Sequence, residues 1–444
     1  MTSFQDFGLA DPIARALREE NYLTPTPIQA QTIPLALAGR DVVGIAQTGT
    51  GKTASFALPI LHRLLENRVR PQPKSCRVLV LSPTRELSGQ ILDSFNTYGR
   101  HIRLSSTLAI GGVPMGRQVR SLMQGVEVLV ATPGRLLDLV QSNGLKLNQV
   151  EFLVLDEADR MLDMGFAEDA QRLAEACGPH QTLLFSATTG GNGLREMVAK
   201  VLKDPQHLML NSVSQLNEGT RQQIITADHN YHKEQLVDWL LANETYDKAI
   251  VFTNTRVQAD RLYGKLVAAG VKAFVLHGEK DQKDRKLAID RLRQGAVKVL
   301  VATDVAARGL DVEGLDLVIN FDMPRSGDEY VHRIGRTGRA GGEGLAVSLI
   351  CHTDWNLMSS IERYLKQRFE RRTIKELKGV YQGPKNLKAS GKAAGSKKKK
   401  TEKKDPKKAT AAKRKSGPRP AGKPSVLVSA DGSAPLKRKK PAAE

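Results

Sequence analysis

The chain has 444 residues and a formal net charge of +20, from 67 Lys or Arg and 47 Asp or Glu. Residues 381–444 hold 20 of the basic and 4 of the acidic residues, so residues 1–380 are nearly neutral, with 47 and 43. A secretory signal and a membrane span are excluded: the first 20 residues carry four acidic side chains, and no run approaches the ~18 apolar residues of a span.

The first 380 residues exceed the ~250–300 at which one hydrophobic core stops growing, so two domains are expected. Short apolar runs recur between stretches of helical length, which is typical of buried parallel strands. The predicted class is therefore α/β. The runs are Val78–Leu81, Val126–Val130, Phe152–Leu155, Thr182–Phe185, Ala249–Phe252, Ala273–Leu276, Val297–Val301, Leu317–Asn320 and Leu345–Ile350.

The polar segment Asn211–Gly219 divides this series and predicts a linker, placed at residues 211–220 between domains at 1–210 and 221–379. The sequence Val128–Thr132 recurs unchanged as Val299–Thr303. The repeat favours two related domains.

Residues 380–444 are rich in Lys, Ala, Ser, Gly and Pro, with lysine clusters at 397–400 and 437–440. Such a composition predicts a disordered tail. It would bind RNA phosphates by releasing counterions; the alternative is a tail that only improves solubility. The three cysteines are far apart in sequence and are expected to be reduced thiols.

The strongest local motif is Ala46–Thr53, Ala-Gln-Thr-Gly-Thr-Gly-Lys-Thr, between an apolar run and a predicted helix at Ala54–Leu65. Glycines let backbone N–H groups surround an anion at a helix N-terminus. Lys52 can then reach the outer phosphates of a nucleotide, and the Thr53 hydroxyl can ligate Mg²⁺. The general pattern has Gly where this chain has Ala46.

A second motif, Asp156-Glu157-Ala158-Asp159, follows the predicted strand Phe152–Leu155. Phosphoryl transfer to water needs one carboxylate to hold Mg²⁺, largely through water, and another to orient and deprotonate the attacking water. Asp156 suits the first task and Glu157 the second.

The second half contributes His332–Arg339, an Arg- and Gly-rich turn. Guanidinium groups there can stabilise charge on a transferring phosphoryl group. Without the other motifs, such a turn could equally be a general contact to phosphate or nucleic acid.

Together these motifs resemble the DEAD-box family of ATP-dependent RNA helicases over roughly residues 4–375, with likeness to bacterial SrmB- and RhlE-type members. Other family blocks occur in order: Tyr22–Gln29, Pro83–Leu87, Gly111–Gly112, Thr132–Arg135, Ser186–Thr188, Val251–Asn254, Gln282–Arg285 and Ala302–Asp311. The resemblance implies two tandem RecA-like domains that bind ATP with Mg²⁺ and also bind RNA.

The resemblance also implies roles for single residues. In the nucleotide site, Gln29 would read the adenine edge with Tyr22 and Phe4 packed near the base, and Asp311 would approach the ribose. The phosphates would be held by Gln47, Thr48, Gly49, Thr50, Gly51, Lys52 and Thr53. Arg336 and Arg339 would act as arginine fingers, and Ser186 and Thr188 would couple hydrolysis to strand separation. The RNA-facing set would be Pro83, Thr84, Arg85, Gly112, Thr132, Arg135, Arg256 and Thr303.

The expected activity is RNA-stimulated ATP hydrolysis coupled to local unwinding of short RNA duplexes or to RNP remodelling. Large-subunit ribosome assembly or RNA turnover is the expected setting. Two alternatives are an ATP-gated RNA clamp or annealing chaperone driven by the tail, and a DNA translocase, which the motif set disfavours. The cytoplasm is the expected location, with a nuclear address the alternative for the lysine clusters. A monomer suffices for the mechanism.

Overall fold

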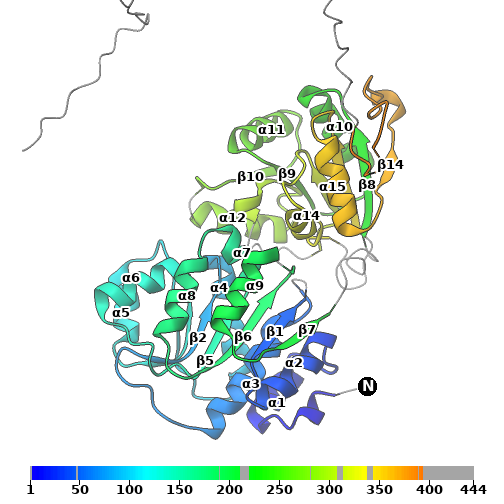
Figure 1. Cartoon of the computed structure of the whole chain (residues 1–444). Coiled ribbons are helices and arrows are strands. Elements are labelled where there is room, and N and C mark those ends of the chain that lie inside the picture. The colour runs from blue at the N-terminus through cyan, green and yellow to red at the C-terminus, as the bar shows by residue number, and fades with distance from the viewer. Residues whose placement is uncertain are drawn as a thin grey trace, which may run out of the picture. The chain divides into compact units, whose positions relative to one another are not determined.

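The computed structural model describes residues 3–46, 49–189, 191–210, 220–280, 282–307, 314–337, 344–388 and 390–393. The predicted linker at 211–219 and the tail from 394 onward lie outside these residues. Figure 1 shows two parallel sheets with helices on both faces of each, so the α/β prediction is confirmed.

Domain 1, the first RecA-like unit, has a seven-stranded parallel sheet in the order β3-β4-β2-β5-β6-β1-β7. Its strands are β1 (Val42–Ile45), β2 (Cys76–Leu81), β3 (Ser106–Ala109), β4 (Val126–Ala131), β5 (Phe152–Leu155), β6 (Gln181–Ser186) and β7 (Gln206–Met209). Its helices are the 3₁₀ turn Phe4–Phe7, α1 (Asp11–Glu19), α2 (Pro27–Leu37), α3 (Lys52–Glu66), α4 (Arg85–Tyr98), α5 (Met115–Leu122), α6 (Pro133–Asn143), α7 (Ala158–Asp163), α8 (Ala167–Ala176) and α9 (Gly191–Val201).

The central strands of domain 1 are largely apolar on both faces because both faces are covered. Val78 and Val80 pack on one side with α1 to α4, while Leu79 and Leu81 pack on the other with α5 to α9. Side chains alternate along a strand, so consecutive residues of one apolar run supply both cores.

Domain 2 repeats this design, with the order β10-β11-β9-β12-β13-β8-β14, again all parallel. Its strands are β8 (Thr220–Thr226), β9 (Ala249–Thr253), β10 (Ala273–Leu276), β11 (Val299–Thr303), β12 (Leu317–Asn320), β13 (Gly344–Ile350) and β14 (Glu370–Arg372). Its helices are α10 (Asn230–Asn243), α11 (Arg256–Ala268), α12 (Gln282–Arg293), α13 (Asp304–Ala307), α14 (Gly327–Ile334) and α15 (Trp355–Leu365), followed by a 3₁₀ turn at Lys375–Leu377.

The repeated pentapeptide occupies equivalent places in the two sheets. Val128–Ala131 ends β4 and Val299–Thr303 forms β11, and each strand is second in its sheet. The repeat therefore marks two related domains, as predicted. All three cysteines are free thiols, and within the described residues no helix is long and apolar enough to cross a membrane.

The parallel arrangement decides where chemistry can occur. The loops after β1, β2, β4, β5 and β6 all leave the sheet of domain 1 at its carboxyl edge, where ligands bind in open α/β sheets. Every predicted motif of domain 1 from Ala46 to Thr188 lies in or beside one of these loops, or in the loop after β3.

Candidate nucleotide and RNA sites

The nucleotide loop leads from β1 directly into α3. Gly49 and Gly51 have φ values of 84° and 87°, a left-handed conformation in which glycine has no steric penalty. Gly51 is the N-cap, so Lys52 and Thr53 form the first turn of a 15-residue helix. The N-terminal amides of α3 and the Lys52 ammonium therefore meet at one place, which suits a phosphate group. Gln47 and Thr48 lie outside the described residues.

Gln29 holds this loop in place. Its side-chain nitrogen donates to the Gly51 carbonyl at 3.1 Å, and its side-chain oxygen accepts from the Thr26 N–H at 2.9 Å. A Cβ on Gly51 would lie 2.3 Å from the Gln29 nitrogen, so only glycine permits this approach. To read an adenine edge, as the resemblance implies, Gln29 would have to share or release these hydrogen bonds.

Lys52 presents a buried ammonium group without a protein partner. Its Nζ has no hydrogen bond within the described part of the chain, and the side chain is 6% exposed. A buried charge is costly unless an opposite charge neutralises it. Lys52 at the N-terminus of α3 therefore fits a bound polyphosphate.

Asp156 lies at the end of β5, close enough to Lys52 for their charges to interact. Burial raises the pKa of Asp156 to about 6, although the Lys52 charge acts in the opposite direction. Among the described residues no cluster of three or more His, Cys, Asp or Glu could hold a metal ion by itself. Mg²⁺ is usually bound by only one or two protein carboxylates, while substrate phosphates and water supply its other ligands. One buried carboxylate beside a phosphate site is therefore sufficient.

Glu157 is held in an unusual backbone conformation. Its φ is 51°, in the left-handed region, and its N–H donates to Asp156 Oδ1 at 2.9 Å. The Arg160 Nε lies 3.3 Å from Glu157 Oε2, and both side chains are almost fully buried. Burial would raise the pKa of Glu157, but its interactions with Arg160, Lys52, His332 and Arg336 together lower it. Glu157 is thus kept ionised, as a general base must be.

Asp159 joins the acidic motif to the Ser186–Thr188 segment. Its Oδ2 accepts from the Thr188 N–H at 3.1 Å and from the Thr188 hydroxyl at 2.9 Å. The Ser186 hydroxyl donates to the Thr188 carbonyl at 2.6 Å and closes the turn. The same Asp159 oxygen lies 3.4 Å from His332 Nε2 on α14 of domain 2. Sequence reasoning assigned no role to Asp159 or His332 individually, although both lie inside motifs that it identified.

The arginines of the His332–Arg339 turn differ in what they can do. Arg333 is 1% exposed and donates to Asp304, Asn254, Asn320 and the Asp322 carbonyl, so its guanidinium is used within domain 2. Arg336 lies close enough to Glu157 for its charge to lower the pKa of that carboxyl. This difference favours Arg336, rather than Arg333, as an arginine finger. Arg339 and Asp311 lie outside the described residues.

The aromatic residues predicted near the base form one cluster. The rings of Phe4 and Tyr22 lie 6.1 Å apart, and Tyr22 is 5.8 Å from Tyr98, with the two hydroxyls 3.2 Å apart. Tyr22 is 37% exposed, so part of its ring faces solvent and is available to a ligand.

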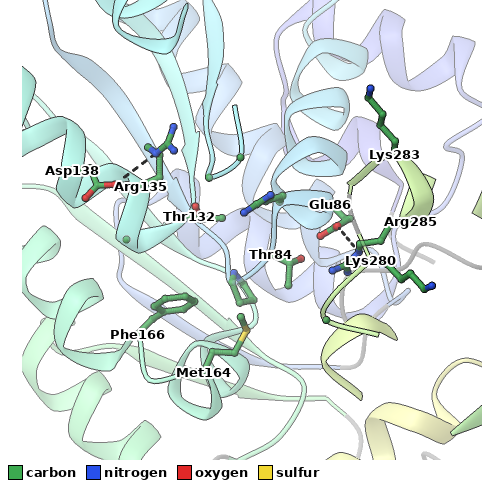
Figure 2. A pocket seen from close by; sticks show the side chains of 16 residues that line it. Thr84, Glu86, Thr132, Arg135, Asp138, Met164, Phe166, Lys280, Lys283 and Arg285 are labelled. Carbon is green, nitrogen blue, oxygen red and sulfur yellow. Dashed lines mark ion pairs between the residues drawn. The ribbon is translucent and has the colours of Figure 1, made fainter. Parts of the chain in front are cut away.

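Six of the eight predicted RNA-facing residues line one pocket of about 710 Å³: Pro83, Thr84, Arg85, Gly112, Thr132 and Arg135. Thr84 is the N-cap of α4 and Thr132 the N-cap of α6. Two helix N-termini and two arginines in one pocket suit the phosphates of a nucleic-acid strand. Lys280, Lys283 and Arg285 of domain 2 also line it, and Figure 2 shows Arg285 paired with Glu86, at 3.2 Å between Nε and Oε1.

Glycine is required where the pocket wall meets Arg85. Gly112 has a φ of 76°, and a Cβ there would lie 2.2 Å from Arg85 Nη1. Arg135 is held by a hydrogen bond from Nη1 to the Val113 carbonyl, at 2.9 Å. Arg256 and Thr303 do not line this pocket. Arg256 pairs with Glu279, which lies between the lining residues Gly278 and Lys280, and Thr303 ends β11.

Comparison with known proteins matches the two halves to two family models. Residues 26–197 match the DEAD/DEAH box helicase model, and residues 232–341 match the helicase conserved C-terminal domain. The chain is 42% identical over 387 residues to the ATP-dependent RNA helicase SrmB of Escherichia coli, covering 86% of each protein. It is 38% identical over 370 residues to the DEAD-box ATP-dependent RNA helicase CshA of Bacillus subtilis, covering 83% of this chain and 74% of CshA.

Among solved structures, it resembles S. cerevisiae Dbp5 bound to RNA and ADP BeF3, with a TM-score of 0.75 and 31% identity, over 84% of this chain and 96% of the other. Fold and site together define an NTP-hydrolysing enzyme with tandem RecA-like domains. The chain belongs to the DEAD-box family of ATP-dependent RNA helicases. Its expected likeness to SrmB is thereby confirmed.

Proposed function

We propose that this helicase couples hydrolysis of Mg²⁺-bound ATP to local unwinding of short RNA duplexes or to remodelling of RNA–protein particles. The observation that carries the proposal is the set of contacts at Asp159. One carboxylate of the acidic motif contacts Thr188 and lies 3.4 Å from His332 of domain 2. A change at the nucleotide can therefore reach both the coupling segment and the second domain through a single side chain.

The proposed division of labour follows from the contacts. Lys52 and the amides at the start of α3 bind the phosphates, and Asp156 holds Mg²⁺ with Thr53. The ion supplies charge neutralisation on the phosphoryl oxygens. Glu157, kept ionised by Arg160, takes the proton of the attacking water, and Arg336 stabilises the developing charge. The pocket containing Arg85 and Arg135 grips the RNA backbone, which gives binding without sequence preference.

The decisive variant is Glu157→Gln, which keeps the size of the side chain and removes its capacity to accept the proton. A general base typically contributes about 10²–10⁴-fold to rate, so ATP turnover should fall by that order while ATP and RNA binding persist. The measurement is duplex-stimulated ATP hydrolysis together with strand separation. Glu168→Gln, an exposed carboxylate on α8, is the matched control. Unchanged turnover and strand separation in Glu157→Gln would show that the base is assigned wrongly.

The biological role that we propose is assembly of the large ribosomal subunit or RNA turnover, in the cytoplasm and with one copy of the chain. It is supported by the 42% identity to SrmB. Crosslinking RNA to the protein in cells and sequencing it tests this role. Enrichment of large-subunit ribosomal RNA is expected for assembly, and broad recovery of messenger RNA would contradict it in favour of turnover.

A further inference from the structure

Domain 1 has a second pocket, of about 420 Å³, at the edge of its sheet away from the motifs. The pocket is lined by the carboxyl-terminal half of α3, by the loops that lead into β2 and β3, and by three residues at the amino ends of α1, β2 and β4, namely Pro12, Arg77 and Glu127. These loops enter the sheet at the amino ends of its strands, whereas the nucleotide and RNA motifs follow the carboxyl ends. A ligand in this pocket would leave both motif sites free. The pocket is called the arginine groove below.

The floor of the arginine groove is aliphatic. Leu61 and Leu64 of α3 are buried, and Leu65, Ile102 and Leu104 are partly buried against the same core. The volume lies within the ~300–1,000 Å³ typical of pockets that bury small ligands or anchor side chains. Among the described residues, no Phe, Tyr or Trp lines the groove, so this lining lacks the aromatic faces on which nucleic-acid bases stack.

The rim is cationic. Arg68 and Arg70 lie on the loop before β2 and Arg103 on the loop before β3, and all three are exposed. Within the described residues, none of the three forms an ion pair or hydrogen bond through its side chain. Free guanidinium groups around an apolar floor are complementary to a ligand that carries carboxylates beside apolar side chains.

Both loops are held in place from inside the domain. Arg77 is 3% exposed, pairs with Glu151 through Nε and Nη2, and donates from Nη1 to the Val69 carbonyl at 3.2 Å. Val69 lies between Arg68 and Arg70. Glu127, a carboxylate in the lining, accepts from the N–H and hydroxyl of Ser105, next to Leu104. The arginines are therefore presented on anchored loops, which reduces the entropy that binding must overcome.

We propose that the arginine groove is a docking site for an acidic, amphipathic peptide segment of a partner protein. Its apolar side chains would enter the leucine floor and its carboxylates would pair with Arg68, Arg70 and Arg103. Such anchors in a pocket, ringed by charged contacts, are the usual composition of a peptide-binding surface. The site would recruit a partner to the helicase while ATP and RNA stay bound.

The test uses the full chain and fluorescein-labelled 12-residue peptides. One peptide has leucines and glutamates on opposite faces of a helix, and a second replaces every leucine by serine. The basic tail would bind both equally through charge, whereas the groove should prefer the leucine peptide. Anisotropy should show that Arg68→Glu combined with Arg103→Glu weakens the leucine peptide by about tenfold or more.

The control variant is Arg172→Glu, an exposed arginine on α8, which packs on the opposite face of the sheet. It should leave peptide affinity within about twofold, a difference of less than ~0.5 kcal/mol. All variants should keep RNA-stimulated ATP hydrolysis, which verifies their folding. Equal affinity for the two peptides, or no loss in the double variant, would overturn the proposal. Weaker binding of a 12-nucleotide single-stranded RNA by the double variant but not the control would assign the groove to RNA instead.

Discussion

At the scale of single residues, the pKa values of three neighbouring carboxyls are shifted in opposite directions by the same fold. Burial raises the pKa of Asp156 to about 6. Glu157 and Asp159 are equally buried, yet neighbouring side chains hold both of their pKa values below the ordinary range, chiefly Arg160 for the first and His332 for the second. The difference matches the proposed roles. A base and a coupling residue must be charged whether or not a ligand is bound, whereas an ion binder needs its full charge only when the ion is present.

The raised pKa of Asp156 predicts a dependence of stability on pH. The folded protein binds this proton more tightly than the unfolded chain, whose carboxyl has a pKa near its ordinary value of 3.8. Ionising Asp156 therefore costs folding free energy: nothing below about pH 4, and fully, by about 3 kcal/mol, above about pH 6. In buffer without Mg²⁺ or nucleotide, Asp156→Asn should raise the Tm at pH 7.5, by up to roughly 10 °C.

Scanning calorimetry at pH 7.5 and pH 4.5 measures this effect, and the gain should shrink to roughly a third at the lower pH, which is still above the unfolded pKa. Glu168→Gln, whose carboxyl is exposed, should show no such pH-dependent gain. An Asp156→Asn Tm equal to that of the parent at pH 7.5 would mean that burial does not penalise the carboxylate.

At this scale the sequence could indicate which residue types gather, but not how they are paired. Lys52, Asp156 and Glu157 follow from local motifs because each motif is a strand end or helix start with its own chemistry. The bond between Gln29 and the Gly51 carbonyl, and the enclosure of Arg333 by Asp304 and Asn320, join segments far apart in the chain. Only the tertiary fold determines such partners.

At the scale of elements, central strands were predictable and several others were not. The central strands Phe152–Leu155 and Leu317–Asn320 have the predicted bounds, because a strand covered on both faces is a continuous apolar run. The edge strand Ala273–Leu276 has its predicted bounds too, because it is also a continuous apolar run. The strands β3, β7 and β14 lie at sheet edges and are half-buried or exposed. β8 is central but contains Gln222 and Gln223, whose amides bond to Tyr330 and Glu370. Because these two glutamines interrupt the apolar run, the sequence of β8 did not show the pattern of a buried strand.

The segment after domain 2's last 3₁₀ turn packs on the domain, which its polar amino-acid composition did not predict. Residues 379–388 and 390–393, the C-terminal strap, pack on α10 and α15 although they contain few apolar residues. The N–H groups of Val380 and Tyr381 donate to Asp228 at 3.0 and 2.7 Å. The Gly391 carbonyl accepts from Trp355 Nε1 at 3.1 Å and from the Ser359 hydroxyl at 2.8 Å. Most of the strap lies in residues expected to be disordered tail, and these contacts connect it to domain 2.

The C-terminal strap predicts that the position of a truncation matters. The Trp355 ring is 1% exposed in the full chain, and ending the chain at Lys378 would uncover it. The truncation would also remove the hydrogen bond from Trp355 to the Gly391 carbonyl and the one from the Tyr381 N–H to Asp228. Uncovering a buried aromatic ring and removing several hydrogen bonds costs about 3 kcal/mol or more. The Tm of domain 2 should fall by roughly 6–12 °C, with a shift in tryptophan fluorescence. Ending the chain at Ala394 is the control and should change neither. Equal Tm values for the two truncations would contradict a stabilising strap.

At the scale of the whole molecule, charge and chemistry lie in different parts of the chain. The proposed catalytic residues belong to the nearly neutral first 380 residues. Residues 395–444, beyond the strap, hold 17 Lys or Arg and 4 Asp or Glu, a net charge of +13. The family membership explains the reaction, and we expect this excess charge to affect how long the enzyme stays bound to RNA.

Removing residues 395–444 therefore separates the two candidate mechanisms. A catalyst aided by its tail should keep its maximal RNA-stimulated ATP turnover but bind RNA more weakly. The plot of log affinity against log salt should become shallower, by ~0.7 for each phosphate of single-stranded RNA that the tail had neutralised. An annealing chaperone driven by the tail should instead lose its strand-annealing activity and much of its effect on RNA structure. Because this truncation keeps the strap, domain 2 should stay as stable as in the full chain, and neither result can be caused by a loss of stability. A truncation at residue 380 would remove the strap and would not allow this distinction. An unchanged salt slope would show that the tail does not bind phosphates, and the RNA would then be held by the Arg85 and Arg135 pocket alone.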